Sequence, residues 1–154
     1  MYQNSKKVPH LSERNNYMAG KFYKGLKNIN WYATTTEGAK ELSKTFLTGS
    51  DFRLLFYLLS NINDDNQVKL NNYENIGNEI NMTKTTIKKS IMNLKANEII
   101  AKDIDEVKTL FINPKFFYAG NHKQIEEKQS FFNKCHKEYL DNKSKMTTNN
   151  KNTN

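Results

Sequence analysis

Two amphipathic segments joined by a three-residue turn constrain the fold of this chain most strongly. Within each segment, apolar residues recur three or four positions apart, as on one face of a helix. These positions are Tyr73, Ile76 and Ile80 in the first segment, and Ile87, Ile91 and Leu94 in the second. The turn is Asn81-Met82-Thr83, and the Thr83 hydroxyl is a suitable N-cap for a helix from Lys84 to Ala96. Two short helices with so short a connection have the spacing of a helix-turn-helix.

The segments on either side of this pair predict a winged helix. A helix from Ser50 to Asn61 is apolar around nearly its whole circumference, so we expect it to be buried on two faces. A short strand, Val68 to Leu70, precedes the two helices. The β-rich runs Ile99–Ile104 and Val107–Ile112 follow them and predict a hairpin. This order indicates an α+β, mainly helical fold, a winged helix-turn-helix whose third helix enters the major groove of DNA.

The rest of the chain divides around this domain. Residues 1–28 are polar and basic and predict a flexible arm, and residues 29–121 form the winged-helix domain, which begins with a strand over Ile29–Thr35 and a helix over Glu37–Phe46. Residues 122–141 predict a C-terminal amphipathic helix, and residues 142–154 a disordered tail. The apolar stripe of that C-terminal helix covers the first helix of the domain or pairs two subunits into a homodimer. Its members are Ile125, Phe132, Cys135 and Tyr139.

Charge and cysteine content narrow the partners and the compartment. The net charge of +8 and the pI near 9.4 favour a polyanionic partner, and double-stranded DNA is the first candidate. Only Arg14 and Arg53 are arginines. A strong preference for lysine over arginine is also typical of proteins from AT-rich genomes, so part of the positive charge has an explanation other than DNA binding. The single cysteine excludes an internal disulfide and a multi-cysteine zinc site. With neither a signal peptide nor a membrane-spanning run in the sequence, we expect a cytoplasmic protein without a membrane partner.

The outer face of the helix from Lys84 to Ala96 is the candidate DNA-binding site. Its hydroxyl, amide and ammonium groups suit base edges and phosphates, and the helix contains no acid. The alternative is an ordinary solvated lysine face. We expect Lys88 to contact phosphate and Lys89 and Asn93 to read bases, each from an exposed position that tolerates alanine. The predicted DNA-binding residues are Lys84, Thr85, Thr86, Lys88, Lys89 and Asn93.

Catalytic patterns are weak. The histidines His10, His122 and His136 are far apart in sequence, and no glycine-rich phosphate loop is present. The acidic hairpin tip around Asp103, Asp105 and Glu106 reads as solvated turn residues rather than a metal site, and phosphate would repel it. We therefore predict a protein that is not an enzyme and has no cofactor or metal, and the acidic tip does not by itself decide whether the hairpin contacts DNA.

Three stretches resemble RepL-type replication proteins of Gram-positive bacterial plasmids. They are Leu47–Leu59, the pair Ile76-Gly77, and Ile112–Asn121, in which an Ile-Asn-Pro sequence closes the predicted hairpin. The similarity covers roughly residues 29–121. It implies a replication initiation protein that binds plasmid origin DNA, has no nicking activity of its own and recruits host replication proteins. A winged-helix transcriptional regulator is the alternative, because a fold does not determine its function.

Overall fold

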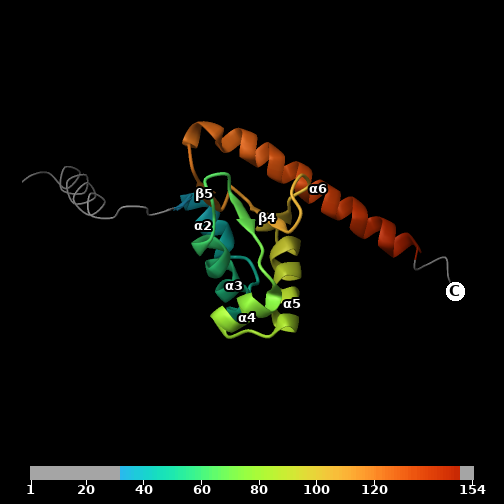
Figure 1. Ribbon diagram of the computed structural model, residues 1–154. Helices are drawn as coiled ribbons and strands as arrows, with labels where there is room; N and C mark the ends of the chain where they lie inside the picture. The colour runs from blue at the N-terminus through green and yellow to red at the C-terminus, as the bar shows by residue number, and fades with distance from the viewer. Residues whose placement is uncertain (1–31, 150–154) are drawn as a thin grey trace, which may run out of the picture.

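The computed structural model describes residues 32–149 and has a mixed α and β architecture (Figure 1). The predicted basic arm, residues 1–28, lies outside the described residues. The elements in chain order are β1 (Tyr32–Thr34), α2 (Thr36–Leu42), α3 (Gly49–Ser60), β2 (Gln67–Lys69), α4 (Tyr73–Ile80), α5 (Lys84–Ala96), β3 (Ile100–Lys102), β4 (Thr109–Ile112), β5 (Phe117–Ala119), the 3₁₀ helix η1 (His122–Gln124) and α6 (Ile125–Asn149).

Short side chains cap the three central helices, and the cap at Thr83 is the one predicted above. The Thr48 hydroxyl and the Asp51 carboxylate form a reciprocal capping box at the start of α3. Asn72 caps α4, and Thr83 caps α5 by accepting from the backbone N–H of Thr86. Asn81 ends α4 in the left-handed conformation, with φ of 52°, which lets the chain turn directly into α5.

Two small antiparallel sheets complete the fold. In the first, β4 lies between β2 and β3, so the predicted hairpin is present but its strands are shorter than the apolar runs. In the second, β1 pairs with β5, and Tyr32 lies opposite Ala119. The sequence did not predict β5. Its partner is more than eighty residues away, so no local pattern indicates the pairing.

The main core lies between α3, α4, α5 and one face of the three-stranded sheet. Its fully buried members include Leu54, Leu58, Ile76, Ile87, Leu94, Ile100 and Ile112. The expectation that α3 is buried on two faces is wrong. Phe52 and Phe56 are 39% and 58% exposed, because no described element packs over that side of the helix.

The helix α6 packs on the other face of the three-stranded sheet. Phe132 and Cys135 are buried against Ala101 of β3 and Phe111 of β4, in a second core separate from the first. Both alternatives for the C-terminal stripe are therefore wrong for these two residues. Strand alternation explains the arrangement, because Ala101 and Phe111 point away from the main core and leave an apolar face that α6 covers.

The second half of α6 extends beyond the body of the molecule (Figure 1). The helix continues to Asn149, so the predicted disordered tail is wrong over residues 142–149. At its other end, Lys128 is buried and donates to the backbone carbonyls of Asp64 and Ala119, the latter at 3.0 Å. Burial lowers the pKa of this lysine. Within residues 32–149, no helix has the length and apolar character needed to cross a membrane.

Candidate nucleic-acid interface

The connection between α4 and α5 fixes the direction of α5. The backbone N–H of Met82 donates to the carbonyl of Gly77 at 2.9 Å, closing the turn. A side chain at Gly77 would collide with the carbonyl oxygen of Met82, so the close approach of the turn requires glycine there. The start of α5 is therefore held by backbone contacts as well as by its apolar face.

The helix α5 separates into an inner and an outer face, as its period predicts. Ile87, Ile91 and Leu94 are buried in the main core, and Ser90 is buried beside them. Most of the predicted DNA-binding residues lie on the other side and are exposed: Lys84, Thr85, Lys88 and Lys89. The nearest described acid to this set is Glu74, whose exposed carboxylate lies 3.9 Å from the Lys84 Nζ. Pairs this exposed contribute little to stability, so Lys84 remains available to a stronger anionic ligand.

Thr86 occupies an intermediate position. It is half-buried, and its hydroxyl shares a hydrogen bond of 2.8 Å with the hydroxyl of the N-cap Thr83. The side chain therefore belongs to the helix cap, and Thr85 is the more accessible of the two hydroxyls.

Asn93 does not point outward as predicted. Its Nδ2 donates to the Asp51 Oδ2 at 2.6 Å, and its Oδ1 accepts from the Asn97 Nδ2 at 3.3 Å. The side chain is half-buried between α3 and α5. Helical period alone placed it on the outer face. The period could not reveal an acceptor on another helix, 42 positions earlier in the chain.

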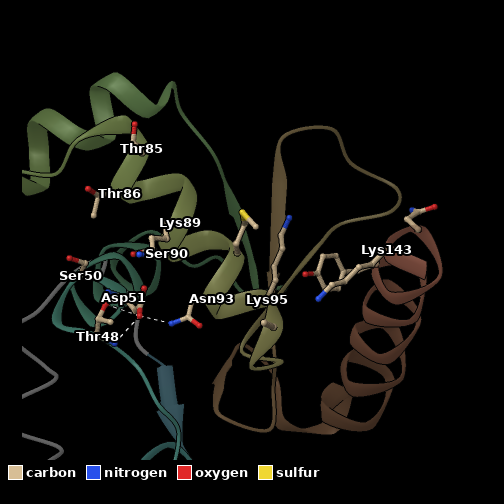
Figure 2. Close-up of a pocket in the computed structure, with 14 residues that line it drawn as sticks. Thr48, Ser50, Asp51, Thr85, Thr86, Lys89, Ser90, Asn93, Lys95 and Lys143 are labelled. Atoms are coloured by element: carbon tan, nitrogen blue, oxygen red, sulfur yellow. Dashed lines mark hydrogen bonds between the residues drawn. The ribbon is translucent and has the colours of Figure 1, made fainter. Parts of the chain in front are cut away.

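The acceptor, Asp51, is a buried carboxylate at the start of α3 (Figure 2). It also accepts from the backbone N–H and the hydroxyl of Thr48, both at 2.8 Å. Burial alone would raise the pKa of this carboxyl, but hydrogen bonds from Thr48, Ser90 and Asn93 outweigh it and lower the pKa. Asp51 is therefore an anion that connects the first turn of α3 to α5.

An open cavity of about 960 Å³ lies against the outer side of α5. Figure 2 shows Thr85 and Lys89 along one wall and Lys143 of α6 on the opposite side, with Lys95 between the two helices. Tyr139 and Asn142 also line it from α6. Sequence reasoning missed this contribution, because nothing in the α6 pattern indicates which part of the domain it faces.

Asp103, at the end of β3, is buried and is not a solvated turn residue as predicted. Its Oδ1 accepts from the backbone N–H groups of Asp105 and Glu106 at 2.8 and 3.0 Å, and its Oδ2 accepts from the Gln67 Nε2 at 2.8 Å. These donors compensate the cost of burying the charge and organise the turn. Asp105 and Glu106 are exposed, as expected.

No cluster of metal-ligating side chains occurs among residues 32–149. His136 lies 3.6 Å from the exposed carboxylate of Glu98, and His122 belongs to η1, whereas His10 is outside the described residues. Comparisons of the chain with protein-family models, with curated proteins and with solved structures returned no match. The resemblance to RepL-type proteins therefore stays a prediction, and the functional conclusion depends on the geometry around α5.

Proposed function

We propose that this protein binds double-stranded DNA by placing the outer face of α5 in the major groove. The observation that supports this most directly is the exposed set Lys84, Thr85, Lys88 and Lys89, on a helix without a single acid. The major groove, about 12 Å wide, admits an α-helix. Ammonium groups neutralise phosphates and release condensed counterions, and a hydroxyl or an ammonium can also contact base edges.

The order of elements supports a winged helix-turn-helix. The sequence α3, β2, α4, α5 and the β3–β4 hairpin follows that layout, with a tight turn between α4 and α5. In this arrangement α5 is the recognition helix. Its buried inner face and its contact with Asp51 hold it rigidly, which favours a fixed register on the duplex.

The functional groups of α5 divide into two roles. Lys88 contacts phosphate and contributes to affinity for any sequence. Lys89 and Thr85 read base edges, with the ammonium suited to guanine. Asn93 positions the helix and does not read a base, because Asp51 and Asn97 already engage its amide.

We further propose, from the resemblance to RepL-type proteins, that the DNA is a plasmid replication origin in the bacterial cytoplasm. In that role the protein recruits host replication proteins. The Ile-Asn-Pro segment of the resemblance has a structural role here. The Asn113 side chain donates to the carbonyl of Glu98 at 2.8 Å and accepts from the backbone N–H of Lys115 at 3.0 Å, so it joins the end of α5 to the chain entering β5.

Fluorescence anisotropy with the cognate origin duplex and a scrambled duplex tests the DNA-binding proposal. We expect Lys88→Ala to weaken binding to both duplexes and to lower the slope of log affinity against log salt by about one. Lys89→Ala should cost about 1–3 kcal/mol on the origin duplex and reduce its preference over the scrambled one. Lys134→Ala, an exposed lysine on α6, is the control. Wild-type affinity in both α5 variants would contradict the proposal.

The origin assignment has its own test. Replication of a plasmid that carries this gene should fail when Lys88 and Lys89 are both replaced by alanine, and a second copy of the intact gene should restore it. A plasmid that keeps its copy number while a neighbouring promoter is derepressed would refute an initiator role.

A further inference from the structure

A second basic surface lies beside α5, in a cleft between this helix and the β3–β4 hairpin. The cleft has a volume of about 610 Å³, and lysines reach it from both elements. Lys84 and Lys95 come from α5, about three turns apart and therefore on one side of the helix. Lys102 and Lys108 come from the hairpin. No carboxylate is among the described residues that line it.

Strand alternation directs Lys102 into this cleft. Lys102 lies opposite Leu110 in the register of β3 with β4, and Ile100 lies opposite Ile112. Ile100, Leu110 and Ile112 all face the main core. Lys102 is two positions after Ile100, so it lies on the same face of the sheet, past the edge of the core and beside α5. Burial and then the charge of Lys102 lower the pKa of Lys95, as expected for two lysines that line the same cleft.

Lys108 enters from the turn of the hairpin. Its backbone adopts the left-handed conformation, with φ of 59°, and its carbonyl accepts from the backbone N–H of Leu70 at 2.8 Å. A left-handed non-glycine residue stores conformational strain, and here a hydrogen bond to the neighbouring strand segment holds it. Lys95, Lys102 and Lys108 have no ion-pair partner among residues 32–149.

The acids of the hairpin lie on its other side. Asp105 and Glu106 line a separate cavity of about 390 Å³, together with Asp65 and with Glu127 of α6. Asp103 is buried between its donors. The hairpin is therefore polarised, with lysines toward α5 and carboxylates toward the start of α6. The reason for expecting DNA to avoid the hairpin, its acidic tip sequence, does not apply to the face that lies beside α5.

We propose that this cleft binds phosphate groups of the DNA backbone while the outer face of α5 occupies the adjacent major groove. The proposal depends on the DNA-binding function proposed above and extends it to the hairpin. The ammonium groups of Lys95, Lys102 and Lys108 have no ion-pair partner among residues 32–149, and only the exposed Glu74 lies beside Lys84, so the cluster is repulsive and phosphates of the duplex relieve that repulsion. The acidic side of the hairpin faces away and limits the orientations in which the protein approaches DNA.

The test compares two double variants with the same net charge. Lys102→Gln/Lys108→Gln removes the hairpin half of the cleft, and Lys40→Gln/Lys134→Gln removes two exposed lysines on α2 and α6. For the cleft variant we expect the salt slope of DNA binding to fall by about 1.8, which corresponds to roughly 60-fold weaker binding at 0.1 M salt relative to 1 M. The loss should be equal for origin and scrambled duplexes, and the thermal midpoint should match that of the control.

Each outcome separates the two proposals. If the cleft variant has the salt slope of the control while Lys88→Ala reduces it, the cleft does not bind the backbone and the function of α5 stands. If neither change affects DNA binding, both proposals fail. A titration with ATP and inorganic phosphate addresses a free phosphate ligand. Saturable ATP binding that the cleft variant loses, with an unchanged salt slope for DNA, would overturn the assignment to DNA.

Discussion

The contact between Asn93 and Asp51 leads to a prediction opposite to the one from sequence. As an exposed base-reading residue, Asn93 would tolerate alanine. In the structure its Nδ2 donates to a carboxylate that is only 3% exposed, at 2.6 Å. Replacing it by alanine removes a donor from a buried charge and leaves the Asn97 amide without one acceptor.

The expected loss in free energy of unfolding is large for a single substitution near the surface of a helix. A hydrogen bond to a charged group contributes about 1.5–3 kcal/mol. Asp51 keeps its two bonds from Thr48, so we expect Asn93→Ala to cost about 2 kcal/mol. For a domain of this size, that lowers the urea midpoint by about 1 M. Lys89→Ala, one turn earlier and exposed, should change stability by less than about 0.5 kcal/mol.

Urea unfolding followed by circular dichroism measures both variants. A double-mutant cycle with Asp51→Asn isolates the pair, and we expect a coupling energy of at least about 1 kcal/mol. The reasoning is refuted if Asn93→Ala unfolds at the wild-type midpoint and instead loses preference at one base pair of the target. That result would mean that the Asn93 amide is free to read DNA.

Three further predictions concern the turn, α6 and acid pH. Gly77→Ala should destabilise the fold by about 2 kcal/mol or more, because its methyl group meets the backbone of the α4–α5 turn. Gly49→Ala, in open space, should be neutral or stabilising by about 0.5 kcal/mol in the same thermal melts. Phe132→Ala should cost about 3–5 kcal/mol, whereas Leu140→Ala, at a side chain 49% exposed, should cost far less; equal losses in urea would contradict the packing of α6 on the sheet. The lowered pKa of Asp51 stabilises the fold above its unfolded-state pKa of about 3.9, and this contribution is lost as the pH falls through the lower folded-state pKa. Stability measured from pH 5 to 2 should therefore fall less steeply for Asp51→Asn than for wild type.

Local signals predicted the helices well because their ends depend on adjacent residues. Thr83 and Asn72 cap α5 and α4 through bonds to residues two or three positions away, and the period of Ile87, Ile91 and Leu94 identifies the inner face of α5. These features are legible in a single sequence, and they locate the candidate site.

Contacts between distant segments could not be predicted in this way. Asn66 is one case: it is fully buried, its Nδ2 donates to the carbonyls of Ile112 and Phe117, and its Oδ1 accepts from the backbone N–H of Ala119. It reads in the sequence as an ordinary turn residue. Three other features depend on tertiary packing in the same way. They are the pairing of β1 with β5, the packing of α6 on the sheet, and the hydrogen bond between Asn93 and Asp51.

The central claim, that α5 contacts DNA, can be tested by cleavage from a tethered reagent. Cys135 is 2% exposed, and burial raises the pKa of its thiol, so an introduced surface cysteine is labelled selectively. Thr85→Cys places an iron–EDTA reagent on the outer face of α5. Lys123→Cys places it in η1, next to the start of α6, at the other end of the body from the start of α5 (Figure 1). We predict strong cleavage within the bound origin duplex from position 85 and background cleavage from position 123. Cleavage that is stronger from position 123 would show that DNA binds elsewhere.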